Sequence, residues 1–70
     1  MNKPDQALVH RYLYYVLMKP VMSDRDYDRL EMDAVDEAPD DHPIHGIGSS
    51  NARDYSLEIR QAAHRLLEGK

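Results

Sequence analysis

The chain has 70 residues, with no Cys, Phe or Trp, and its formal net charge at pH 7 is −4. Such a length allows one domain with a modest core, which rarely contributes more than roughly 3–5 kcal/mol to stability. The composition excludes disulfides and thiolate zinc sites, and the acidic balance argues against direct binding of nucleic acid, whose phosphates require clustered Lys and Arg.

The first expected helix covers roughly residues 4–18. Asn2 can cap it and Pro4 falls in its opening turn. Apolar residues then recur at three- to four-residue spacing, as Leu8/Val9, Tyr12/Leu13 and Val16/Leu17. Pro20 disfavours helical geometry at the residue before it, so the sequence predicts a turn at residues 19–22.

A second helix is expected at about residues 24–37. Ser23, followed three residues later by Asp26, resembles a capping box with Asp in place of Glu. Acidic residues in this first turn also interact favourably with the helix dipole. The face predicted to point inward carries Tyr27, Leu30, Ala34 and Val35.

Residues 38–50 contain two prolines, two glycines and paired serines without a helical period, which predicts a loop. Only residues 44–47 are weakly strand-like. Asn51, with Asp54 three residues later, offers the cap of a third helix that ends near residues 68–69. Its predicted apolar positions are Tyr55, Ile59, Ala62, Ala63 and Leu66. The expected fold is therefore a single all-α domain, a helical hairpin plus a C-terminal helix, with a Pro/Gly loop between helices 2 and 3.

The start of the second helix carries two carboxylates and a phenol on one face. Asp24, Tyr27 and Asp28 occupy positions i, i+3 and i+4, and the bend at residues 19–22 could bring Tyr14 and Tyr15 against them. From the residues alone, two interpretations stay open. Either the tyrosines pack in the core while the acids cap the helix, or these five residues form a small polar site.

Two motifs in this region resemble the N-terminal Ia domain of the bacterial NAD-dependent DNA ligases. The first is YLYYVL at residues 12–17, followed by a proline and by SDRDYDRL at residues 23–30. The second is DHPIHGIG at residues 41–48, which is similar to the family's Asp-Ser-Pro-Thr-x-x-Val-Gly loop. Both occur in the family's order, and the resemblance covers roughly residues 8–48.

This resemblance implies recognition of nicotinamide mononucleotide (NMN). In the family, the Ia domain closes over the NMN half of NAD while a lysine of the next domain attacks the adenylyl phosphate. The positions that match the NMN-contacting residues are Tyr14, Tyr15, Asp24, Tyr27 and Asp28. These residue types suit the ligand, because aromatic faces attract a flat pyridinium cation and carboxylates neutralise it or bind ribose hydroxyls. We expect NMN or NAD as a weak ligand and no required cofactor.

The chain also departs from the ligases. None of Lys3, Lys19 and Lys70 lies in the family's Lys-x-Asp-Gly nucleotidyl-acceptor motif, and the ligases' zinc-finger and helix-hairpin-helix modules have no counterpart. We therefore expect a non-catalytic module that binds a nicotinamide nucleotide, or a protein partner through the same surface. A stand-alone module of this kind suggests a phage or another mobile element.

A different function is suggested by the acidic middle of the chain. Residues 23–41 carry nine acidic residues and two arginines. Closely spaced carboxylates can imitate a row of phosphates and occupy a basic groove. The alternative is thus a small acidic inhibitor, encoded by a phage, of a host nucleic-acid enzyme or defence complex. A third option is the detached subunit of a split ligase, with the ligase body as partner. Candidate residues of the acidic face are Asp33, Asp36, Asp40 and Asp41.

Metal binding and membrane insertion have little support in the sequence. His42 and His45 have the spacing of a metal pair, but they lack supporting thiolates. There is neither a signal-peptide core nor an apolar run of 18 residues, so we expect a soluble, cytoplasmic protein without a metal site or a membrane partner.

Overall fold

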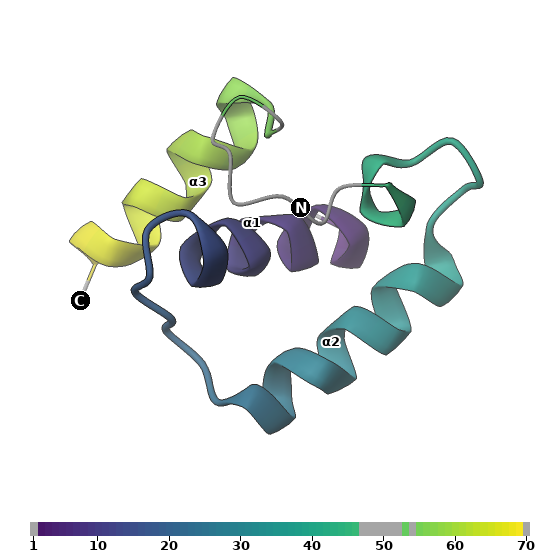
Figure 1. Ribbon diagram of the computed structural model, residues 1–70, viewed down its shortest axis with the longest axis horizontal. Coiled ribbons are helices and arrows are strands. Elements are labelled where there is room, and N and C mark those ends of the chain that lie inside the picture. The colour runs from purple at the N-terminus through teal and green to yellow at the C-terminus, as the bar shows by residue number, and fades with distance from the viewer. Residues whose placement is uncertain (1, 47–52, 54, 70) are drawn as a thin grey trace.

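The computed structural model describes residues 2–46, 53 and 55–69, and all regular structure within these residues is helical (Figure 1). Helix α1 spans Lys3–Tyr15, α2 spans Asp24–Glu37 and α3 spans Leu57–Glu68, and a 3-10 turn, η1, lies at Pro43–His45. The predicted all-α architecture, a helical hairpin followed by a C-terminal helix, is confirmed. No helix in the described part of the chain has the length and apolar character that a membrane span requires.

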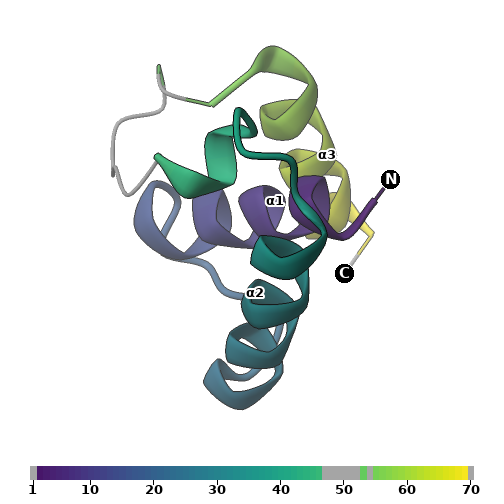
Figure 2. The same ribbon diagram turned by 90° about the vertical axis from the view of Figure 1, so that its right-hand side faces the viewer.

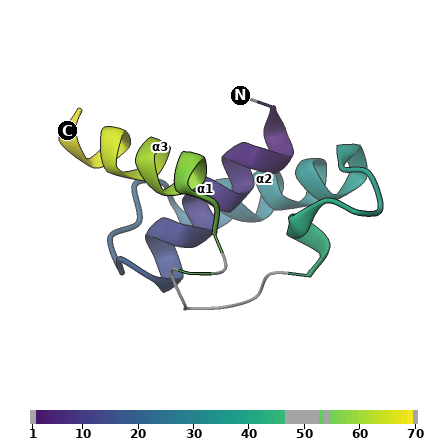
Figure 3. The ribbon, with the colours of Figure 1, turned by 90° about the horizontal axis from the view of Figure 1, so that it is seen from above.

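Helix α1 lies at the centre of the fold and packs against α2, α3 and η1. Figure 1 shows it between α2 on one side and α3 on the other. The turned view places η1 over α1, and the view from above shows that α1 runs obliquely to α3 (Figures 2 and 3). Side chains on several faces of α1 are therefore covered, whereas α2 and α3 each have one side against α1 and another side facing solvent.

The first two helices begin at the predicted caps. The Asn2 side chain accepts a hydrogen bond from the Asp5 N–H at 3.0 Å, and the Ser23 hydroxyl accepts one from the Asp26 N–H at 3.2 Å. Each bond satisfies an amide that has no partner inside its helix, which fixes the residue at which the helix begins.

The third helix begins later than predicted. The proposed cap at Asn51 lies outside the described residues, and α3 is instead capped by Ser56, whose hydroxyl accepts from the Ile59 N–H at 3.3 Å. Tyr55 precedes the helix and is buried, with its ring centroid 5.2 Å from that of Tyr12 in an edge-to-face arrangement. This packing holds Tyr55 against α1 before α3 begins.

Helix α1 ends at Tyr15, three residues before its predicted end. The Leu17 N–H bonds the Tyr12 carbonyl at 3.2 Å and the Lys19 N–H bonds the Leu13 carbonyl at 2.8 Å. These bonds reach over five and six residues instead of four, so they unwind the helix end. The chain can then reverse towards α2.

This reversal places Met18 in the left-handed region, with φ 54°. Its side chain is 80% exposed, so it adds little packing. Because glycine adopts this conformation without steric cost, Met18→Gly should raise the free energy of unfolding by up to about 1 kcal/mol in urea denaturation. The matched control is Met32→Gly, since Met32 is 74% exposed inside α2. That change should lower stability by about 1 kcal/mol. A Met18→Gly protein less stable than wild type would contradict the prediction.

The core lies between α1 and its three neighbours. Ile44 of η1 belongs to it, and this 3-10 turn lies within the segment predicted as a loop, where residues 44–46 form no strand. Val35 is 43% exposed, so its predicted inward position is wrong, and Leu66, one of the predicted apolar positions of the third helix, is 40% exposed. Since α2 and α3 use only a narrow stripe against α1, residues at the edge of that stripe reach solvent. The buried apolar cluster consists of Ala7, Leu8, Val9, Tyr12, Leu13, Ala34, Ile44, Tyr55, Ile59 and Ala63.

Candidate functional site

Three tyrosines and an aspartate gather where α1 ends and α2 begins. The ring centroid of Tyr14 lies 5.4 Å from that of Tyr27 and 6.2 Å from that of Tyr15, with interplanar angles of 45° and 46°. The Tyr14 hydroxyl donates a hydrogen bond to the Asp24 carboxylate. Four of the five residues matched to NMN contacts thus lie together, and we call Tyr14, Tyr15, Asp24 and Tyr27 the tyrosine cluster.

The cluster has a buried base and an exposed rim. Tyr27 is 7% exposed, Tyr14 is half-buried, and Tyr15 is 54% exposed. Asp24 lies at the first position of α2, where its carboxylate faces solvent and also benefits from the helix dipole. A ligand approaching from solvent would therefore meet the Tyr15 ring and the Asp24 carboxylate first.

The fifth residue, Asp28, is not joined to the cluster by any hydrogen bond or ring contact among the described residues. It is exposed and lines a shallow concavity of about 630 Å³ along α2. The other residues that line this concavity are Glu31, Met32, Asp33, Val35 and Asp36. We call these six residues the α2 acidic surface.

The base of the cluster is held by Arg11, a residue that the sequence did not single out. Arg11 is 6% exposed, and its Nε donates to the Tyr27 hydroxyl at 3.2 Å. One terminal nitrogen bonds Glu31 at 2.6 Å, and the other bonds the Ile44 carbonyl at 3.3 Å. The guanidinium therefore ties α1 to α2 and to η1. The sequence places Tyr27 and Glu31 on one face of α2, at i and i+4, but no local pattern assigns Arg11 to them.

This network controls the charge states beneath the cluster. Burial alone would lower the pKa of Arg11, but hydrogen bonds and charges from Tyr27 and Glu31 outweigh it and raise the pKa. For Tyr27, burial raises the pKa more than the neighbouring guanidinium lowers it. At physiological pH Arg11 is therefore a cation and Tyr27 a neutral phenol, so the hydrogen bond between them joins a charged donor to a neutral hydroxyl.

The two loop histidines make contacts within the fold. His42 Nδ1 accepts from the Ile44 N–H at 3.1 Å, and its Nε2 lies 3.0 Å from an Asp5 carboxylate oxygen. His42 therefore caps η1 and fastens it to the first turn of α1. His45 is exposed, with Nε2 3.5 Å from the Ala38 carbonyl. Within the described residues, no group of three His, Asp or Glu side chains is arranged to hold a metal ion.

The four residues proposed as an acidic face are exposed but differ in surroundings. Asp33 lies 3.5 Å from the Lys3 ammonium, which also approaches Glu37 at 3.6 Å. Asp36 lies on the α2 acidic surface, whereas Asp40 and Asp41 belong to the turn that follows α2. Asp28 and Glu31, which were not assigned to this face, lie on the same surface as Asp33 and Asp36.

The predicted site residues thus divide into a tyrosine cluster at the hairpin bend, carboxylates along α2, and Asp40 and Asp41 in the turn that follows α2. The tyrosine cluster combines aromatic faces with one carboxylate, a set that suits a flat cation. The α2 acidic surface combines carboxylates with exposed Met32 and Val35, a set that suits a basic partner with an apolar contact. Comparisons of the chain with protein-family models, with curated proteins and with solved structures find no significant match.

Proposed function

We propose that this protein is a non-catalytic binding module that holds the nicotinamide half of a nucleotide at the tyrosine cluster. The observation that supports this most strongly is the convergence of three tyrosine rings from two helices beside the carboxylate of Asp24. Packing alone accounts for Tyr27, which is buried, but not for Tyr15, which leaves more than half of its surface in water.

Oxidised nicotinamide nucleotides carry a flat pyridinium cation. An aromatic face attracts such a cation by about 0.5–2 kcal/mol, depending on how much water is excluded. The Asp24 carboxylate supplies a negative charge at the edge of the rings and can accept hydrogen bonds from ribose hydroxyls. The resemblance to the ligase Ia domain supports the same ligand, because the cluster consists of positions that match its NMN contacts. Asp28 is proposed as an outer contact, since it is exposed one helical turn beyond Asp24.

The affinity should be low. A ligand of about 20 heavy atoms at roughly 0.3 kcal/mol per atom reaches only about −6 kcal/mol, and an open site loses part of that. We therefore expect a dissociation constant between about 0.1 mM and several mM. An affinity this low is what we expect of a module that binds tightly only when a second protein closes over the ligand, as an adenylation domain does in the ligases.

An NMR titration tests the proposal. NMN should shift amide resonances near Tyr15 and Asp24, whereas AMP should not, because it lacks nicotinamide. Reduced NMN, whose ring is neutral, should bind several-fold more weakly than NMN. No NMN-specific shifts at about 10 mM ligand would remove the proposal.

Variants make the test specific to the cluster. Tyr15→Ala removes an exposed ring and should weaken NMN binding by about 5-fold or more, and Asp24→Asn should weaken it through loss of charge. Asp40→Asn, an exposed change of the same kind outside the cluster, should leave the affinity unchanged. Equal effects of Asp24→Asn and Asp40→Asn would point to general electrostatics instead of a site.

The α2 acidic surface supports a second candidate function, the binding of a basic protein partner. Met32 and Val35, 74% and 43% exposed, offer apolar contact among the carboxylates of Asp28 and Asp36. Such a surface fits the inhibitor hypothesis, with a host nucleic-acid enzyme as partner, and equally fits the body of a split ligase. It becomes the preferred function if the NMN titration shows no specific binding.

A further inference from the structure

The solvent-facing side of α3 carries Glu58 and Arg65, and Ala62 and Leu66 lie beside them at the edge of the helix that borders α1. Glu58, Ala62, Arg65 and Leu66 occupy positions i, i+4, i+7 and i+8, so they form one stripe along the helix. Leu66 is 40% exposed. Glu58 and Arg65 are exposed, and neither forms an ion pair with any residue that the structure describes.

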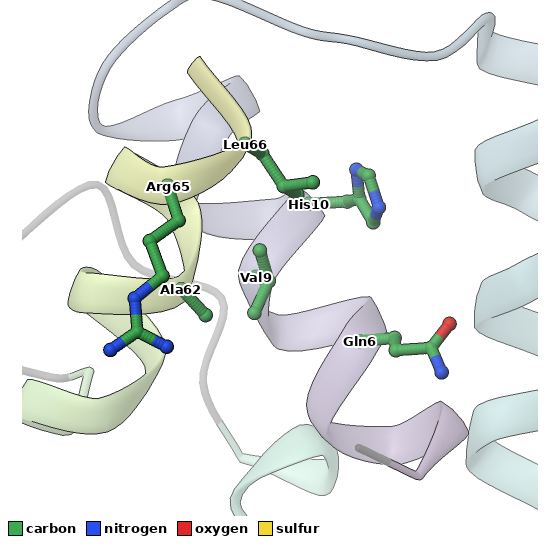
Figure 4. Close-up of a pocket in the computed structure, with 6 residues that line it drawn as sticks. All are labelled: Gln6, Val9, His10, Ala62, Arg65 and Leu66. Carbon is green, nitrogen blue, oxygen red and sulfur yellow. The ribbon is translucent and has the colours of Figure 1, made fainter. Parts of the chain in front are cut away.

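This stripe borders a groove between α1 and α3 of about 410 Å³ (Figure 4). Val9 and Ala62 point towards each other across it, and Arg65 extends along α3 with its guanidinium away from His10. His10 Nδ1 is buried without a hydrogen-bond partner among the described residues, and burial lowers the pKa of His10. The groove is thus an uncovered apolar surface that has a cationic side chain at its edge. The residues that line it are Gln6, Val9, His10, Ala62, Arg65 and Leu66.

The stripe of one copy is complementary in charge to the same stripe of a second copy. Glu58 and Arg65 are seven residues apart, which is two helical turns or about 10.5 Å. When two α3 helices run antiparallel about a two-fold axis near Ala62, Glu58 of each copy comes opposite Arg65 of the other. A two-fold contact repeats every pair, so both ion pairs form together. The small side chain of Ala62 at the centre allows the two helices to approach closely.

We propose that α3 is the contact surface of a homodimer, in which two α3 helices pack antiparallel and cover the grooves beside them. A second copy fits this surface better than it fits the α2 acidic surface, which is lined by four acidic and no basic side chains and would repel itself across a two-fold axis. Association also suits a chain of 70 residues, whose single core contributes only modest stability. Standard interfaces bury roughly 1,200–2,000 Å², and a contact through one pair of short helices should be smaller, so we expect a weak dimer with a dissociation constant in the micromolar range or above.

Sedimentation equilibrium of the full chain between about 10 µM and 1 mM tests this inference. The mean mass should rise with concentration from the monomer mass of 8.1 kDa towards twice that value. Glu58→Arg and Arg65→Glu should each raise the dissociation constant about 10-fold or more, because each change turns two attractions into two repulsions. Asp36→Arg, a charge reversal on α2, should leave the dimer as it is. A monomer throughout this range would overturn the proposal.

Mixing the two single variants gives the sharpest result. The heterodimer of Glu58→Arg with Arg65→Glu has opposite charges at both contacts, so an equal mixture should regain most of the wild-type association. Failure of the mixture to associate better than either variant alone would overturn the antiparallel arrangement.

An NMR dilution series of the wild-type protein gives a check that needs no variant. The amide resonances of α3 and of residues 6–10 should shift as the protein is diluted. Shifts confined to α2 would place the contact elsewhere.

Discussion

Arg11→Met should lower the free energy of unfolding by about 2–4 kcal/mol. Methionine fills most of the same volume but removes every donor, so the Tyr27 hydroxyl and the Ile44 carbonyl lose their bonds from the guanidinium. Leaving buried polar groups without partners costs about 1–3 kcal/mol each. Glu31, whose side chain is 37% exposed, is hydrated after the change and adds less. Urea denaturation followed by far-UV circular dichroism measures the loss.

The matched control is Lys3→Met, which removes a cation from the same helix. The Lys3 ammonium lies 3.5 Å from Asp33 and 3.6 Å from Glu37, but all three side chains are about half exposed. Solvent screens such pairs, so this change should cost less than about 1 kcal/mol. If both variants were equally stable, the Arg11 network would not hold the hairpin together.

Adding Tyr27→Phe and Glu31→Leu to Arg11→Met should recover part of the loss in stability, because no unpaired polar side chain then remains in the network.

Leu13→Ala should be at least as damaging, with an expected loss of about 2–5 kcal/mol. Leu13 has no exposed surface and lies in the central helix, so its removal leaves a cavity between α1 and its neighbours. A core of this size contributes roughly 3–5 kcal/mol, so a substantial fraction of the variant should be unfolded at 25 °C. The loss of helical signal at 222 nm and a lower urea midpoint would report this.

Leu57→Ala provides the comparison for Leu13→Ala. Leu57 is 61% exposed at the first position of α3, and alanine has a high helix propensity, so stability should change by less than about 0.5 kcal/mol. The measurement belongs at low protein concentration, where the proposed dimer is dissociated. A Leu13→Ala protein within about 1 kcal/mol of wild type would mean that the core closes around the missing side chain.

The sequence by itself determined the first two helices and the meeting of their ends. The caps at Asn2 and Ser23 bond amides only three residues away, and the apolar spacing within each helix is equally local. Given the turn that Pro20 predicts at residues 19–22, the end of α1 is expected near the start of α2. The contact of Tyr14 with Asp24 and Tyr27 therefore follows from short-range features. Whether the cluster binds a nucleotide stays a prediction.

Only the tertiary structure decided which polar residues are buried and where α3 begins. Arg11 bonds residues 16, 20 and 33 positions away, and no local pattern specifies that a lone arginine will find three such partners. Ile44 lies in the core on η1, which His42 fastens to Asp5, 37 positions earlier. The desolvation of each of these groups depends on contacts formed after the chain collapses, whereas caps and periodicity act within one helical turn. Local signals accordingly predicted the helices, and long-range burial determined the base of the candidate site.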